Sequence, residues 1–264
     1  MSTTESKSEL FTVVGANITV EQGSRPVTSR KIVTAFERYI QPCLAELVGC
    51  TLFVFVGCGS VIENTLVPGN IQPALAHGLA LAIVIAVLGP ISGGHFNPAV
   101  SVSVCVSGGL ELLLLGPYIL SQMVGGMIGA GLAKAVFPKN VYASAEGGAF
   151  DTVETSNGIG RATVAEMVMT LFLSLMVCMG AINARTRTPL APLCVGLTVT
   201  ANILAGGSIS GGCMNPARAF GPAVAANYWT YHWIYWVGPV TGALISGSLV
   251  RLMLGDQKTR LLLK

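Results

Sequence analysis

The stretch Ile91–Ala99, which reads ISGGHFNPA, returns 118 residues later as Ile209–Ala217, which reads ISGGCMNPA. Asn followed by Pro is a typical helix start, because Asn caps free backbone N–H groups and Pro suits the first helical position. The two frames predict helix starts at Asn97-Pro98-Ala99 and at Asn215-Pro216-Ala217. A single Asn-Pro turn is commonplace, whereas two in matching nine-residue frames indicate a shared role.

The repeat extends outward from these frames to both sides. A glycine precedes each Asn by 19 residues, and similar dipeptides recur earlier and later in each half. The matching pairs are Gly78 with Gly196, Ala45-Glu46 with Ala165-Glu166, and Gly116-Pro117 with Gly238-Pro239. We therefore expect two related halves.

The composition indicates a membrane protein. Of 264 residues, 52% are hydrophobic and 10% are charged, against about 25% charged residues in a soluble globular protein. Between Glu63 and Glu111, 47 consecutive residues carry no charge. Blocks of this kind exclude a soluble enzyme, a nucleic-acid-binding protein and a disordered scaffold.

Six apolar stretches approach the roughly 20 residues that a membrane-spanning helix needs. They cover residues 43–62, 72–90, 112–136, 161–182, 190–207 and 233–254. The apolar segments 97–106 and 215–226 are too short to cross, which predicts re-entrant half-helices or packed loops. Because each half has three spans, the halves must insert with opposite orientation. The predicted fold class is an all-α membrane protein with six transmembrane helices, two re-entrant half-helices and inverted three-helix repeats.

Lys and Arg residues predict the orientation, since they gather on the cytoplasmic side. With the N-terminus inside, eleven of them face the cytosol and three face outward, with Arg218 within the membrane. We expect a cytoplasmic N-terminal tail (1–38), a first channel repeat (39–137), an extracellular connecting loop (138–160), a second repeat (161–254) and a cytoplasmic C-terminal tail (255–264). The connecting loop has no residues that suggest chemistry.

Inversion points the two half-helix starts at each other near the membrane midplane, where inverted repeats place their functional sites. Each start carries about half a positive charge. We expect the side-chain oxygens of Asn97 and Asn215 to cap the helices, leaving their NH2 groups free to donate outward. Such a site accepts the oxygen of water and repels cations and protons.

Arg218 follows the second Asn-Pro-Ala directly and is the only charged residue between Arg187 and Arg251. A cation within the membrane is costly and by default functional. His77 is the only histidine within the six predicted spans. A lone histidine on an apolar face serves a core or a site equally well, so its residue type leaves both roles open.

Six spans with two Asn-Pro-Ala half-helices resemble the aquaporin family over residues 36–262. The resemblance implies one pore per subunit and a homotetramer. It also implies a constriction built from four positions, which match His77, Ile203, Gly212 and Arg218. This set is similar to the broader plant vacuolar aquaporins that also pass ammonia. Glycerol-passing relatives have Asp directly after the Arg, where this sequence has Ala219.

Four further polar residues have candidate roles. Glu46 and Glu166 occupy equivalent positions and either accept hydrogen bonds from irregular loops or form a proton relay. His95 either lines or gates the cytoplasmic approach to the pore, or pairs with a loop carbonyl. Cys213 is a pore-lining candidate whose thiol would confer mercury sensitivity.

These observations predict a passive channel, not an enzyme, for water, ammonia and hydrogen peroxide in a lipid bilayer. Two alternatives are a proton-coupled transporter that uses Glu46 and Glu166, and a structural membrane tetramer with a vestigial pore. No cofactor, metal or nucleic-acid partner is implied, because no cluster of ligating residues has metal-site spacing. The plasma membrane is the default location, and an intracellular or mitochondrial membrane fits the resemblance.

Overall fold

The computed structural model describes residues 34–66, 69–153 and 155–254, and this part of the chain is helical without strands. The predicted tail 255–264 and most of the tail 1–38 lie outside the described residues. The elements are η1 (Phe36–Ile40), α1 (Gln41–Glu63), η2 (Asn64–Leu66), α2 (Ile71–Ser92), α3 (Pro98–Ser107), α4 (Leu112–Val136), α5 (Lys139–Ser144), η3 (Glu146–Gly148), η4 (Ser156–Gly158), α6 (Ile159–Val177), η5 (Cys178–Ile182), α7 (Ala191–Ser210), α8 (Pro216–Ala226) and α9 (Ile234–Leu254).

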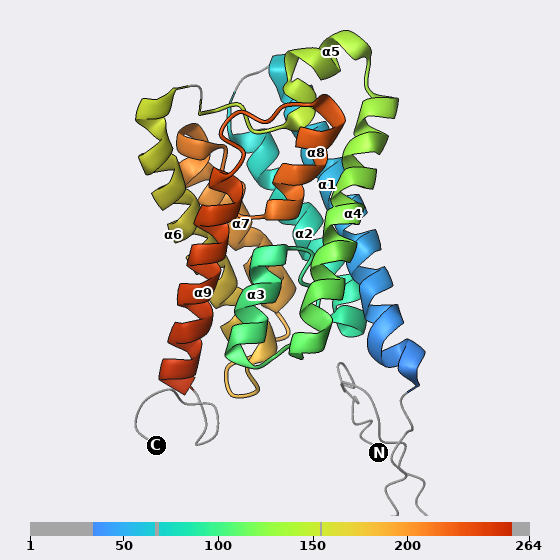
Figure 1. Cartoon of the computed structure of the whole chain (residues 1–264), viewed down its shortest axis with the longest axis vertical. Helices are drawn as coiled ribbons and strands as arrows, with labels where there is room; N and C mark the ends of the chain where they lie inside the picture. Colours follow the sequence, from blue (N-terminus) through green and yellow to red (C-terminus); the bar gives the residue numbers. More distant parts are fainter. Residues whose placement is uncertain (1–33, 67–68, 154, 255–264) are drawn as a thin grey trace, which may run out of the picture.

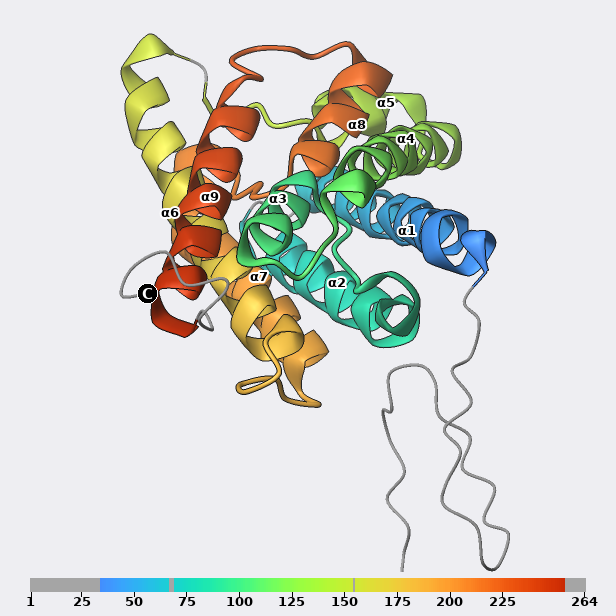
Figure 2. The same cartoon turned by 60° about the horizontal axis from the view of Figure 1, so that its bottom comes forward.

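The six predicted spans and the two half-helices are confirmed. Six helices in the described part of the chain are long and apolar enough to cross a membrane. The half-helices α3 and α8 lie end to end between them (Figure 1). Viewed from the end where α3 lies, the long helices are arranged around this half-helix (Figure 2).

The halves correspond through their helix contacts, with α1 against α4 and α6 against α9. Gly125 of α4 faces the carbonyl of Leu47, and Gly242 of α9 faces the carbonyl of Met167. Leu47 and Met167 directly follow the two matched glutamates. The structure therefore pairs Gly125 with Gly242, and the predicted match of Gly116-Pro117 with Gly238-Pro239 is wrong. Helix-packing glycines, rather than the Gly-Pro dipeptides, preserve the correspondence.

The repeat glycines Gly78 and Gly196 meet where α2 crosses α7. A Cβ atom on Gly78 would lie 2.6 Å from the carbonyl oxygen of Gly196, and Gly196 faces the carbonyl of Gly78 in return. Small residues allow membrane helices this close an approach. The crossing joins the two halves.

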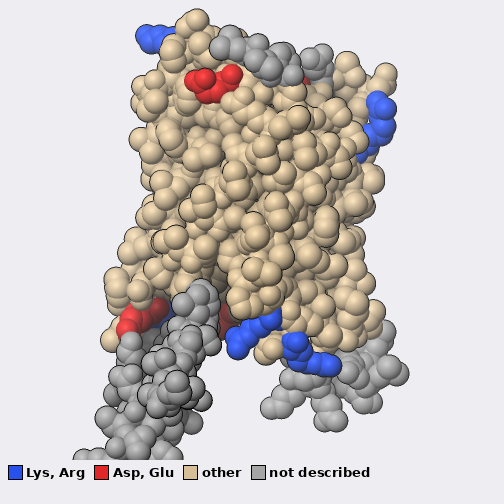
Figure 3. Space-filling view, turned by 180° about the vertical axis from the view of Figure 1, so that it is seen from behind, with Lys and Arg blue, Asp and Glu red and all other residues tan. Residues whose placement is uncertain are grey.

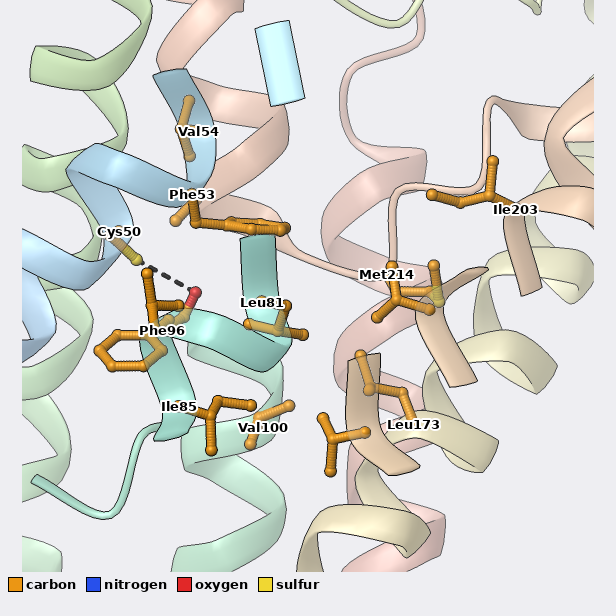
Figure 4. Packing of buried hydrophobic residues seen from close by; sticks show 14 of the residues in the cluster. Cys50, Phe53, Val54, Leu81, Ile85, Phe96, Val100, Leu173, Ile203 and Met214 are labelled. Atoms are coloured by element: carbon orange, nitrogen blue, oxygen red, sulfur yellow. Dashed lines mark hydrogen bonds between the residues drawn. The ribbon is translucent and has the colours of Figure 1, made fainter. Parts of the chain in front are cut away.

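Apolar side chains from both halves pack around the middle of the molecule (Figure 4). The first half contributes Cys50, Phe53, Leu81, Ile85, Phe96 and Val100, and the second contributes Leu173, Ile203 and Met214. The Cys50 thiol donates a hydrogen bond of 3.0 Å to the backbone carbonyl of Phe96, directly before the first Asn-Pro-Ala. The half-helix loops are thus part of this core.

The charged residues lie near the two ends of the molecule, with an uncharged band between them on the face drawn in Figure 3. Large apolar side chains are exposed on the outer surface of several helices, for example Leu79 (54%) and Ile83 (62%) on α2 and Val168 (55%) on α6. This distribution fits a protein surrounded by lipid.

Candidate functional site: a polar cavity at the half-helix starts

Each Asn of the two Asn-Pro-Ala motifs caps its half-helix, as predicted. The side-chain oxygen of Asn97 accepts hydrogen bonds from the backbone N–H groups of Ala99 (2.9 Å) and Val100 (3.4 Å). Asn215 does the same with Ala217 (3.0 Å) and Arg218 (3.3 Å). Pro98 and Pro216 occupy the first helical positions, where a missing N–H has no consequence.

The asparagine amides also tie the two halves together, which the sequence did not predict. Asn97 Nδ2 donates to the carbonyl of Met214, and Asn215 Nδ2 donates to the carbonyl of Phe96, both over 2.9 Å. The expectation that both NH2 groups are wholly free is therefore wrong. Each amide has two hydrogens, so one stays available to a solute.

The residue before each Asn has a left-handed backbone, with φ of 47° at Phe96 and 56° at Met214. This conformation is unfavourable for bulky residues, so neighbouring contacts must hold it. It turns the two carbonyls toward the asparagine amides of the opposite half.

Glu46 of α1, fully buried, holds the first loop. Its Oε1 accepts hydrogen bonds from the Ser92 hydroxyl (2.6 Å) and the His95 backbone N–H (2.9 Å). Its Oε2 accepts from the Phe96 backbone N–H (2.6 Å) and from Gln122 Nε2 (2.7 Å). These are the hydrogen bonds that a structural role requires.

Glu166 of α6, also fully buried, repeats this arrangement in the second half. Its Oε1 accepts from the Ser210 hydroxyl (2.7 Å) and the Cys213 backbone N–H (2.8 Å), and its Oε2 accepts from the Met214 backbone N–H (2.6 Å). Proton transfer through either carboxylate would interrupt bonds that support the irregular loops.

The predicted filter residues His77, Ile203, Gly212 and Arg218 come together around one cavity of about 150 Å³, which Cys213 and Asn215 also line. A volume of this size is ample for several water molecules. His77 comes from α2, Ile203 from α7 and Arg218 from α8, and Gly212 lies in the loop between α7 and α8. The structure thus gathers residues that are up to 141 positions apart in the chain.

Arg218 is 1% exposed and is held by His77. His77 Nδ1 lies 2.6 Å from the carbonyl of Pro73, to which it donates, so its Nε2 accepts from Arg218 Nε over 3.0 Å. The histidine is therefore neutral, with its proton on Nδ1. Gly57 of α1 makes room for this pair, since a Cβ there would lie 2.5 Å from His77 Nε2.

Gly212 contributes only backbone to the cavity wall. Its φ is +66°, and a Cβ would lie 3.2 Å from Cα and Cγ1 of Ile203. Both the backbone conformation and the close neighbour favour glycine. The missing side chain leaves Ile203 as the apolar part of the wall.

His95 and Cys213 occupy equivalent positions but different surroundings. His95 Nδ1 pairs with the Ser101 hydroxyl at 3.0 Å, and its ring packs edge-on against Tyr118. The ring nitrogen thus pairs with a side-chain hydroxyl, so the predicted alternative in which His95 pairs with a loop carbonyl is wrong. The other alternative, in which His95 lines or gates the pore, stays a prediction. Cys213 lines the cavity, and its thiol donates to the carbonyl of Asn215 over 3.1 Å.

The connecting segment between α5 and α6, to which the sequence assigned no chemistry, also reaches the site. The backbone carbonyl of Gly148 accepts a hydrogen bond from Arg218 Nη1 over 2.8 Å, and the ring centroid of Phe150 lies 4.8 Å from Arg218 Cζ. The Gly147-Gly148 pair was the available signal, since both glycines have positive φ. Nothing in the sequence pattern singled out Phe150 or Gly57. Among the residues the structure describes, no group of His, Cys, Asp and Glu could hold a metal ion.

Comparison with known proteins agrees with this geometry. The profile of the major intrinsic protein family matches residues 33–250. The chain is 58% identical to aquaporin-8 of Mus musculus over 229 residues, which cover 87% of this chain and 88% of that protein. It is 36% identical to aquaporin-5 of Homo sapiens over 214 residues, 80% of each.

The fold is similar to the X-ray structure of the aquaglyceroporin from Plasmodium falciparum, with a TM-score of 0.68 at 21% identity. The match covers 80% of this chain and 95% of that one. Six long helices, two capped half-helices and these matches agree, and the predicted resemblance to aquaporins is confirmed. The chain belongs to the major intrinsic protein family and is a membrane channel for water and small solutes, not an enzyme.

Proposed function

We propose that the protein is a passive channel that conducts water, ammonia and hydrogen peroxide and excludes ions and protons. The observation that carries this proposal is the buried guanidinium of Arg218, which forms no ion pair with the described residues, in a cavity wall that also includes Ile203 and the bare backbone of Gly212. A fixed positive charge opposes cations. The apolar and backbone sides leave room for neutral solutes.

Water and ammonia both need a hydrogen-bond donor at the midplane, since each presents a lone pair. The second amide hydrogens of Asn97 and Asn215 supply it, next to the positive ends of α3 and α8. Hydrogen peroxide has similar size and hydrogen bonding and follows the same route. Ala219, in the position where glycerol-passing relatives carry Asp, argues against glycerol.

The alternative of a proton-coupled transporter fits the site less well. Glu46 and Glu166 direct their oxygens at loop N–H groups and serine hydroxyls rather than at the cavity. A structural tetramer with a vestigial pore would not need the polar cavity beside Arg218.

We also propose a homotetramer with one pore per subunit, oriented with both termini in the cytosol. The channel repeats are residues 39–137 and 161–254, the connecting loop 138–160 is extracellular, and 1–38 and 255–264 are cytoplasmic tails. Exposed apolar side chains on α1 and α2 support contact with lipid or with further copies. The plasma membrane is the proposed location, with an intracellular or mitochondrial membrane as the alternative.

The testing experiment uses the full chain in liposomes that contain a pH-sensitive dye. An ammonium gradient imposed across the bilayer raises the internal pH as ammonia enters, and protein-free liposomes give the lipid baseline. Osmotic shrinkage of the same vesicles measures water flux. We expect both rates to exceed the baseline, and water flux to stay linear in the gradient.

The outcomes separate the parts of the proposal. Fast shrinkage without faster alkalinisation would leave a water channel and contradict ammonia conduction. Saturable uptake that follows a proton gradient would favour the transporter.

Arg218→Val is expected to raise proton or cation leak about tenfold, equivalent to ~1.4 kcal/mol of barrier. Arg161→Val changes an exposed arginine outside the cavity and serves as the control.

A further inference from the structure

The guanidinium of Arg218 is held entirely by neutral partners. They are His77 Nε2 on α2, the Gly148 carbonyl in η3, and the ring of Phe150 just after η3. Within the described ranges, the ion pair that the structure contains is that of Arg38 with Glu111, which does not involve Arg218. The positive charge therefore keeps its full effect on the cavity.

The ring of Phe150 is held in a defined slot. It packs against Tyr235 of α9 with the ring centroids 4.7 Å apart. Tyr235 in turn donates a hydrogen bond of 2.8 Å to the carbonyl of Ser210. The next residue, Gly211, has φ of +89°, and a Cβ there would collide with the Phe150 ring. The slot thus depends on α9 and on the loop before α8.

An aromatic ring is chemically suited to hold this arginine. A cation within about 6 Å of a ring centroid is attracted to the ring face, and Arg218 Cζ lies 4.8 Å from that of Phe150. A carboxylate would hold the guanidinium at least as well, but it would neutralise the charge that opposes cations. Asp151, the next residue, is exposed, so an acidic side chain is near but does not pair with Arg218.

We propose that Phe150 is a positioning residue that fixes the guanidinium of Arg218 against the cavity wall and thereby sets the size limit for neutral solutes. The inference rests on the proposed channel function. Without the ring, the two remaining contacts, through Nε and Nη1, hold the guanidinium only within its plane, and the ring no longer supports its face. The guanidinium can then tilt across the cavity, and the solute size limit becomes less sharp.

The experiment compares formamide permeability with water permeability for the full chain in liposomes. Phe150→Leu keeps an apolar side chain but removes the ring, and Phe150→Tyr keeps the ring. Phe220→Leu is the matched control, because Phe220 lies on the same half-helix as Arg218 but packs against Trp229. We expect Phe150→Leu to raise the formamide-to-water ratio about three- to tenfold, and the other two variants to match the unaltered protein.

Dependence on Arg218 distinguishes positioning from simple widening. In an Arg218→Val background, Phe150→Leu should leave the ratio unchanged, because no guanidinium remains to be positioned. An equal rise of the formamide-to-water ratio in both backgrounds, or no rise in either, would overturn the inference. Water conduction by the unaltered protein would then still support the proposed function. Water flux at the lipid baseline in the unaltered protein would instead contradict the proposed function, and the inference with it.

Discussion

At the scale of single residues, Asn97 and Asn215 each combine two roles. The side-chain oxygen is a helix cap, and the side-chain nitrogen is a link to the opposite half. One amide hydrogen on each is left for a solute. Substitution by Asp would keep the cap and lose both donors, which is why an amide is needed here rather than any capping residue.

Cys213 is the cysteine whose modification should block the cavity. Cys213 lines it, whereas Cys50 is fully buried against the Phe96 carbonyl and does not line it. We predict that mercuric ion inhibits water flux into liposomes and that Cys213→Ser removes most of this inhibition. Cys50→Ser is the control and should stay sensitive. Persistent inhibition of the Cys213→Ser protein would place the mercury site elsewhere.

At the scale of helices, contacts through glycine determine how closely the elements approach. Gly78 and Gly196 join α2 to α7, and Gly125 and Gly242 set equivalent contacts of α4 and α9 within the two halves. Because each of these glycines faces a backbone carbonyl, moving a neighbouring side chain, such as the Thr200 hydroxyl beside Gly78, cannot relieve the contact. The helix arrangement is therefore sensitive to a single added methyl group.

The matched pair Gly78→Ala and Gly116→Ala tests this sensitivity. An added Cβ at Gly78 meets the Gly196 carbonyl at 2.6 Å, whereas at Gly116 nothing lies within 4 Å. We expect Gly78→Ala to lower the free energy of unfolding by about 1–3 kcal/mol, the usual effect of overpacking. Thermal unfolding of the detergent-solubilised protein measures it. Equal melting temperatures for the two variants would show that the crossing relaxes.

The buried carboxylates give a second prediction at this scale. Glu166→Gln replaces one accepting oxygen with an NH2 group that faces donors, so at least one buried N–H or O–H loses its acceptor. We expect a loss of about 1–3 kcal/mol in stability. The control is Glu63→Gln, at an exposed helix end. If Glu166→Gln instead abolished proton-driven uptake at unchanged melting temperature, the relay interpretation would be favoured.

The sequence predicted the helices and the capped half-helix starts because apolar length, Asn-Pro dipeptides and repeats are local patterns. It also named the residues that meet around the cavity, through the spacing of the family. It missed the link from each asparagine to the opposite loop, since that bond joins residues 117 and 119 positions apart. Phe150 was missed for a similar reason: its role depends on the distant Arg218 and Tyr235.

At the scale of the whole molecule, the charged residues on the face drawn in Figure 3 lie near its two ends, and large apolar side chains are exposed on the outer surface of the long helices. The polar groups that function needs are instead buried, including Glu46, Glu166 and Arg218. The molecule is therefore apolar outside and keeps these polar groups inside, with Arg218 at the cavity. This is the arrangement that a bilayer as solvent requires.

The proposed tetramer gives a prediction at this scale. Along α1, Val48, Leu52 and Val56 form an exposed apolar row at four-residue intervals, which further copies of the chain would cover. We expect light scattering of the protein in mild detergent to give four chains per particle, and chemical cross-linking to yield species up to four. A protein mass equal to that of one chain would contradict the tetramer, without bearing on conduction by each subunit.

The reciprocal asparagine bonds also have a consequence for biosynthesis. Asn97 emerges from the ribosome 118 residues before Asn215, a delay of roughly 6 to 24 seconds at usual synthesis rates. During that interval the carbonyl of Phe96 lacks its bond from Asn215, and one amide hydrogen of Asn97 lacks the carbonyl of Met214. The first half-helix therefore enters the membrane before its loop can be completed. Completion of both loops is a late event in synthesis, and a chain that stops before Met214 leaves the first one without its bonds to the second half.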